Sequence, residues 1–154
     1  MTAQYWLMKA DAEEESVDDF LAAPRSTLPW TGVRNYQARN FMRDGMGKGD
    51  GVLFYHSSCE VPGVAGIAEV ASAAYPDPTQ FDRKSEYYDE KSTREEPRWM
   101  LVDVAFKRKL KRTITLAELK DQTRLDGFAL LQRGNRLSVL PVTKAQWDAI
   151  LALE

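Results

Sequence analysis

Two segments of the sequence carry aromatic side chains suited to holding a flat ring. Trp30 follows a proline, stands beside a small residue and a glycine, and has no periodic partners that would place it in a core. Tyr75, Asp77 and Phe81 lie in a second segment, where prolines would lower the entropy cost of holding side chains over a ligand. These segments predict a stacking site with a free indole ring. The alternatives are a buried structural tryptophan and, for Asp77, a turn-forming role.

Polar residues at the ends of predicted elements could complete such a site. Asn35 and Tyr36 stand at the start of a predicted helix, where free N–H groups favour anions. His56, Ser57 and Ser58 end an apolar run, where polar side chains would otherwise be wasteful. For His56, a structural role at a strand end remains the alternative to ligand contact.

Positive charge is concentrated locally, although the formal net charge is only -2. A protein that held long duplex DNA by charge alone would usually be more basic. The alternatives for each basic group are a solvated surface and a patch that faces phosphates. One group is Arg34, Arg39, Arg43 and Lys48, and the other is Lys107, Arg108, Lys109, Lys111 and Arg112.

The residues that could support catalysis are few. His56 and Cys59 are three apart, and a cysteine nucleophile with a histidine base is conceivable. No glycine-rich phosphate loop of known spacing is present. One histidine and one cysteine cannot form a zinc site without carboxylates, and the deaminase signature is absent. We therefore expect a protein that is not an enzyme and that uses neither a metal nor a cofactor.

Length and composition indicate an ordinary globular domain. The 154 residues fit one domain, 1–154, and 44% of them are hydrophobic. No apolar run approaches the roughly 18 residues that span a bilayer, and the N-terminal segment lacks the features of a signal peptide. The lone Cys59 agrees with a reducing compartment. We expect a cytoplasmic protein without membrane contact, associated with the nucleoid if the source is bacterial.

Apolar runs and turn residues predict the strands and the fold class. The Pro62-Gly63 turn leaves no room for a crossover helix between its flanking strands, so these should form an antiparallel hairpin. This spacing favours an α+β fold, a mixed and mostly antiparallel β-barrel decorated with short helices, over a doubly wound sheet. The predicted strands are Tyr5–Met8, Val52–His56, Val64–Val70, Trp99–Phe106 and Leu137–Leu140.

Capping signals predict the helices. Ser16 is placed as an N-cap, and 34–43 has helical spacing before a glycine-rich turn at 45–51. Thr115 with Glu118 and Thr143 with Gln146 fit capping boxes. The final helix should bury Trp147, Ile150 and Leu151. Trp6 and Trp99 lie in predicted strands, where core packing is the alternative to ligand contact.

Six sequence blocks in register resemble the EVE domain, a member of the PUA-like superfamily that also holds the YTH and ASCH domains. The blocks are WTGVRNYQARNFM from Trp30, GDGVLFYHS from Gly49, GVAGIAEV from Gly63, YPDPTQFD from Tyr75, PRW from Pro97 and GNRLSV from Gly134. This resemblance covers essentially the whole chain. It implies a PUA-like barrel that captures a modified nucleobase, a modified cytosine in DNA for EVE domains or methylated adenine in RNA for YTH domains.

A base pocket needs aromatic walls, polar groups for the base edge and cations for phosphates. Swinging a base out of its stack costs a few kcal/mol, and stacking returns roughly 1–3 kcal/mol per base. The predicted base pocket comprises Trp30, Asn35, Tyr36, Phe54, His56, Ser57, Ser58, Tyr75, Asp77, Phe81 and Trp99. The predicted phosphate-binding residues are Arg34, Arg39, Arg43 and Lys48.

The same residues leave other functions open. ASCH relatives include hydrolases and nucleases, and Lys9, His56 and Glu69 would be the residues to test for such an activity. A reader of a modified base in RNA is a second alternative. A third is a protein adaptor that grips a methylated side chain by cation–π contact. The sequence does not indicate the oligomeric state.

Overall fold

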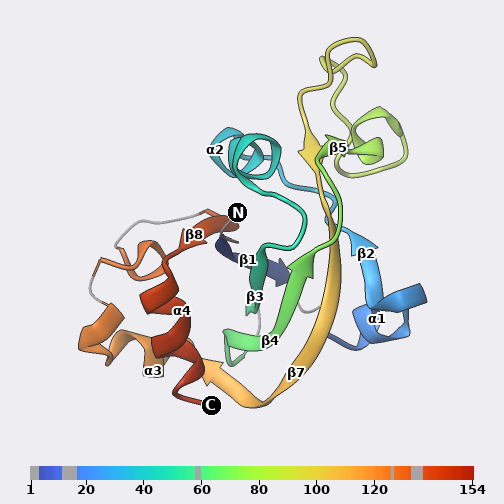
Figure 1. The fold of residues 1–154 in the computed structure, drawn as a ribbon. Coiled ribbons are helices and arrows are strands. Elements are labelled where there is room, and N and C mark those ends of the chain that lie inside the picture. Colours follow the sequence, from blue (N-terminus) through green and yellow to red (C-terminus); the bar gives the residue numbers. More distant parts are fainter. Residues whose placement is uncertain (1–3, 12–16, 58–59, 126, 133–136) are drawn as a thin grey trace.

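The structure is a computed structural model that describes residues 4–11, 17–57, 60–125, 127–132 and 137–154. Its main sheet has six strands in the order β2-β7-β4-β3-β1-β8 and curls into a half-barrel (Figure 1). Among the described strands, β1 and β3 form the one parallel pair of this sheet. The predicted mixed, mostly antiparallel architecture is confirmed. The strands are β1 (Tyr5–Asp11), β2 (Thr27–Pro29), β3 (Gly51–Ser57), β4 (Gly63–Val70), β7 (Asp103–Thr115) and β8 (Val139–Val142).

Short helices and a small second sheet surround the main sheet. The second sheet pairs β5 (Tyr75–Pro76) with β6 (Met100–Leu101). The α-helices are α1 (Val17–Ala22), α2 (Tyr36–Asn40), α3 (Leu116–Lys120) and α4 (Lys144–Leu151), and a π-helical turn, η2 (Phe41–Gly45), continues α2. The 3-10 turns are η1 (Pro24–Ser26), η3 (Pro78–Phe81), η4 (Thr123–Leu125) and η5 (Ala129–Leu131).

The main sheet is covered on both faces at its centre, so β3 is apolar on both sides from Val52 to Tyr55. Along β3, Val52 and Phe54 belong to one hydrophobic cluster, while Leu53 and Tyr55 belong to another. The first cluster includes side chains from α1 and α2, and the second includes side chains from α3 and α4. We call the two sides of the sheet the α1/α2 face and the α3/α4 face.

Local sequence signals placed several elements correctly. The hairpin of β3 and β4 forms as predicted, and both capping boxes are present at the starts of α3 and α4. Ile150 is fully buried as predicted, whereas Trp147, which packs on Tyr5 with ring centroids 4.7 Å apart, and Leu151 are only partly buried at the edge of the core. The helix predicted at 34–43 begins at Tyr36 and ends in the π-helical turn. The proposed N-cap Ser16 lies outside the described residues.

The strand predicted at Trp99–Phe106 differs most from the structure. A separate short strand, β6, precedes β7, and β7 continues to Thr115 through the basic run. Leu110 and Ile114 are buried within this run because the neighbouring β4 and the α3/α4 face cover them. The cations of this run therefore lie on a strand that borders a recess beside His56.

Candidate functional site

The predicted base-pocket residues separate into two regions. Trp30, Phe54 and His56 form a line of aromatic rings on the α1/α2 face, with centroid distances of 5.6 Å and 5.3 Å between successive rings. Tyr36, Trp99 and their cationic neighbours form a second group, where α2 meets the long loop between β5 and β6. The structure therefore does not assemble the predicted set into one pocket.

Trp30 does not stand free, contrary to our expectation. Its relative exposure is 5%, and its ring packs against Phe20 of α1 at 5.8 Å as well as against Phe54. Its backbone N–H donates to the carbonyl of Val102 at 3.0 Å, which fixes the loop against the strand region. The alternative of a structural tryptophan is the correct one, because α1 and the curled sheet together cover the indole. Direct contact between this ring and a bound base remains a prediction.

A recess of about 320 Å³ opens beside the outer end of this aromatic line. His56 contributes its ring, and Phe54, fully buried, packs edge-on behind it. Asp18 of α1 stands at the recess, and β7 supplies positive charge to it. The lining residues are Asp18, His56, Ala65, Lys109, Leu110, Lys111, Arg112 and Thr113. This volume lies at the lower end of the range for small-ligand pockets, which is roughly 300–1,000 Å³.

The surroundings of His56 in the recess shift the pKa of its imidazole. Burial and then the positive charge of Lys109 lower the pKa of His56, and Asp18 acts in the opposite direction. The imidazole of His56 therefore remains neutral at pH values at which a free histidine would already be protonated. A neutral imidazole carries one N–H donor and one acceptor nitrogen, which suits the edge of an uncharged ring.

This shift predicts a pH-dependent stability. The unfolded chain, with the ordinary histidine pKa of 6.5, binds more protons than the folded chain between the two pKa values. The contribution of neutral His56 is therefore complete above the unfolded value and is lost as pH falls through the folded value. We expect urea unfolding to show a fall in stability from about pH 7 to about pH 5. His56→Gln should flatten this fall, and identical slopes in both proteins would contradict the assignment.

Of the two serines that follow His56, the structure describes only Ser57. Ser57 donates its hydroxyl to the carbonyl of Ala10 on the parallel strand β1 at 3.3 Å. Its hydroxyl thus joins two strands. Ser58, the third polar residue of this predicted group, lies outside the described residues.

The second region is a layered stack of rings and cations. Tyr36 stacks on Trp99 with centroids 4.8 Å apart and planes 20° from parallel. The Arg39 guanidinium lies 4.8 Å from the Tyr36 centroid, and Arg34 lies 5.2 Å from Trp99 and 5.4 Å from Tyr87. Trp99 is buried, and its indole N–H donates to Asp89 at 2.8 Å. The stack joins α2 to the loop between β5 and β6, so its rings serve mainly to hold segments together.

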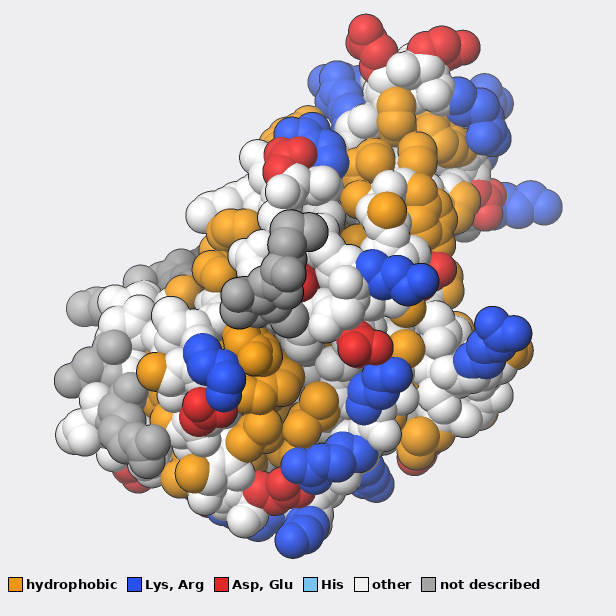
Figure 2. Space-filling model, viewed as in Figure 1, with side chains coloured by type: hydrophobic (Ala, Val, Ile, Leu, Met, Phe, Trp, Pro, Cys, Tyr) orange, Lys and Arg blue, Asp and Glu red, His pale blue; other side chains and the backbone are white. Residues whose placement is uncertain are grey.

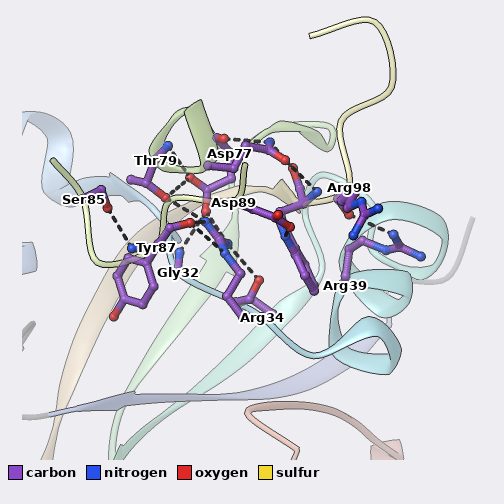
Figure 3. A network of polar contacts seen from close by, with 12 residues as sticks. Gly32, Arg34, Arg39, Asp77, Thr79, Ser85, Tyr87, Asp89 and Arg98 are labelled. Atoms are coloured by element: carbon purple, nitrogen blue, oxygen red, sulfur yellow. Dashed lines mark hydrogen bonds and ion pairs between the residues drawn. The ribbon is translucent and has the colours of Figure 1, made fainter. Parts of the chain in front are cut away.

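Asp77 is committed to the protein itself, which corrects its assignment as an acceptor for a base. The carboxylate is fully buried and accepts from the Gly32 N–H at 2.8 Å and from the Arg34 guanidinium at 3.2 Å (Figure 3). It also accepts from the N–H and the hydroxyl of Thr79, at 2.8 Å and 2.6 Å. Its turn-forming role is the correct one, since these bonds cap η3 and join two loops.

Other predicted pocket residues also have structural partners. Asn35 caps α2 by accepting from the Ala38 N–H at 3.0 Å. Tyr75 donates its hydroxyl to Asp103 at 2.5 Å, and burial together with this neighbour raises the pKa of Tyr75 to about 12. The Phe81 ring lies under the guanidinium of Arg94 at 4.6 Å. These three residues do not line the recess at His56.

The predicted phosphate-binding arginines are mostly engaged within the protein. Arg34 donates to Asp77, to Thr79 and twice to the carbonyl of Tyr87 (Figure 3). Arg39 donates to the carbonyl of Arg98 at 2.8 Å, and Arg43 pairs with Asp44 at 2.9 Å. Lys48 is exposed. Arg34 is therefore a structural residue, because its acceptors come from loops that are distant in the sequence.

Sequence reasoning missed two buried polar residues that shape these loops. Gln80 is buried, donates to the carbonyls of Asp77 and Trp99, and accepts from the Ser92 hydroxyl. Asp50 accepts from the Trp6 indole N–H at 3.0 Å and from the Gly47 N–H at 2.8 Å, which anchors the glycine-rich turn. Buried positions with polar side chains leave no periodic signal in one sequence, so nothing marked them beforehand.

Within the described part of the chain, no three histidine, cysteine, aspartate or glutamate side chains cluster closely enough to hold a metal ion. None of the described helices has the length and apolar character needed to cross a membrane.

The curled mixed sheet with short helices on both faces defines a PUA-like fold. The chain belongs to the EVE domain family, whose model matches residues 4–153. It is 41% identical to human thymocyte nuclear protein 1 over 169 residues, which cover 99% of this chain and 74% of the relative.

Solved structures show the same likeness. A Pseudomonas syringae protein is 49% identical, with a TM-score of 0.92 over 97% of this chain and 98% of the other. The human THYN1 protein, crystallised in complex with DNA that contains 5-methylcytosine, is 41% identical. Its TM-score is 0.93 over 98% of this chain and 97% of the other.

Proposed function

We propose that this protein binds nucleic acid without catalysis and captures one modified base, a modified cytosine in DNA, in the recess beside His56. The observation that carries the proposal is the nearly full-length likeness to the human THYN1 protein, which was solved with DNA containing 5-methylcytosine. The recess supports it, because it is the place where the aromatic line of the core reaches a cationic surface.

The chemistry of the recess suits a flipped base. Extrusion of a base costs a few kcal/mol, and contact with an aromatic face returns roughly 1–3 kcal/mol. His56 offers such a ring in a neutral state, and Ala65 offers a small apolar neighbour. A methyl group that becomes buried there would add about 0.8 kcal/mol. Recognition of the modification is therefore expected to be modest in energy and to add to the binding of the base.

A hydrolase or nuclease is disfavoured by the placement of its candidate residues. The ammonium group of Lys9 lies 5.9 Å from the Tyr55 ring centroid, which belongs to the α3/α4 face, whereas His56 adjoins the α1/α2 face. Glu69 pairs with Lys107 and lies six residues along β4 from Gly63, the partner of His56, which is about 20 Å of strand. These three side chains do not converge on a common substrate.

A binding experiment tests this function. Short DNA and RNA strands carrying cytosine or 5-methylcytosine are titrated against the wild-type protein and His56→Ala by fluorescence anisotropy. We expect the wild type to prefer the modified DNA strand, and we expect His56→Ala to lose about 1–3 kcal/mol of binding together with the preference.

Tyr88→Ala is the matched control, because it removes an exposed ring from the loop outside the recess. It should bind as the wild type does. Equal binding of modified and unmodified DNA by the wild type would refute the proposal, and preference for the RNA strand would instead identify an RNA reader.

A further inference from the structure

The cations of β7 differ in how far they are already neutralised. Lys107 pairs with Glu69 at 3.2 Å, Arg108 with Glu154 at 2.8 Å, and Arg112 with Glu118 at 2.7 Å. Within the described part of the chain, Lys109 and Lys111 form no ion pair of the same closeness, although the charge of Lys111 contributes to lowering the pKa of Glu154. Both are exposed and both line the recess. Figure 2 shows lysine and arginine side chains gathered on the lower part of the viewed face, where Figure 1 places the later half of β7.

The spacing of the two lysines suits successive charges on a nucleic-acid strand. Lys109 and Lys111 are two residues apart on β7, which in a regular strand is about 6.6 Å, and both line the recess although the register of β7 against β4 shifts between Lys109 and Ile114. Lysine acts on phosphate as a mobile point charge, so it needs no fixed fork geometry. A strand that crosses the recess parallel to β7 would place phosphates over both ammonium groups.

The carboxylate at the recess determines on which side of it the backbone of a bound strand can lie. Asp18 of α1 lies close enough to affect His56 and lines the recess together with the two lysines. Its carboxylate repels a phosphate and attracts only a donor group. A bound strand therefore keeps its backbone on the β7 side of the recess.

We propose that Lys109 and Lys111 bind the phosphate groups that flank the nucleotide held beside His56. This inference rests on the proposed function and replaces Arg34, Arg39 and Arg43 as the main phosphate contacts. The three arginines donate to carbonyl and carboxylate oxygens of the protein, whereas the two lysines face the recess.

The salt dependence of binding tests the assignment. Binding of modified and unmodified DNA strands to Lys109→Gln/Lys111→Gln is measured over a series of salt concentrations. We expect the slope of log K against log salt to become shallower by about 1 per lysine, hence by about 2, for both strands. The ratio of affinities for the two strands should stay as in the wild type, because phosphate contacts carry no base identity.

Arg39→Gln/Arg43→Gln is the matched control, since it removes the same charge from α2 and η2. It should change the slope by much less than the lysine pair does. A wild-type slope in the lysine double variant, or a larger change in the arginine pair, would overturn the inference even if the preference for modified DNA persists. If the wild type showed no preference for modified DNA, this would count against the proposed function. The salt slopes would still show whether the lysine pair or the arginine pair contacts phosphates. Single lysine variants, each expected to lower the slope by about 1, give the same comparison if the double variant folds poorly.

Discussion

Trp30→Ala is expected to lower the free energy of unfolding by about 3–5 kcal/mol, because a fully packed tryptophan leaves a large cavity when it is truncated. The indole contacts Phe20 and Phe54, and its loop is anchored to Val102. Urea denaturation followed by fluorescence and circular dichroism measures the change. Any loss of nucleic-acid binding by this variant would therefore include a loss of folded protein.

Two further variants separate packing from recognition at this position. Trp30→Phe keeps an aromatic ring in the cluster and should cost less than the alanine variant, so its binding can be measured on folded protein. Leu21→Ala is the control from the neighbouring helix α1, since its apolar side chain is half exposed. A change of less than about 1 kcal/mol for Trp30→Ala would show that the ring is not part of the core.

Asp77→Ala is expected to destabilise the protein by about 2–4 kcal/mol, because it removes the buried carboxylate of a partly buried ion pair and leaves several donors without their acceptor. The Gly32 N–H, the Arg34 guanidinium and the Thr79 hydroxyl all lose an acceptor. We expect lower stability in urea and faster proteolysis within the segment 82–97.

Asp82→Ala is the matched control for this prediction. Asp82 is exposed in the same loop, and its carboxylate accepts from the Lys84 N–H at 2.9 Å. Its loss should cost less than about 1 kcal/mol. Equal effects of the two substitutions would show that the ion pair with Arg34 does not hold the loop in place.

The sequence predicted those parts of the fold that depend on neighbours along the chain. The hairpin of β3 and β4 follows from a short Pro-Gly connection, and the caps of α3 and α4 follow from residues three apart. The length of β7 was missed because charged residues hide the alternation of Leu110 and Ile114. The hairpin spacing favoured a mixed, mostly antiparallel barrel over a doubly wound sheet, and the family resemblance implied the same PUA-like barrel.

The candidate site was predicted less well, because its contacts join distant segments. Trp30 seemed free since its covering residues, Phe20 and Phe54, belong to α1 and β3. Arg34 seemed available since its acceptors lie 43 to 53 positions further along the chain. The polar ending of β3 did point to His56, because a break in an apolar run is a local signal.

The position of β1 inside the sheet has a consequence for synthesis of the protein. β1 lies between β3 and β8, and Tyr5 pairs with Val142. On the ribosome, one edge of β1 therefore stays without its partner until Val139–Val142 has emerged. An unpaired edge of this kind invites contact with other nascent chains, so we expect refolding in dilute solution to give higher yields than refolding at high concentration.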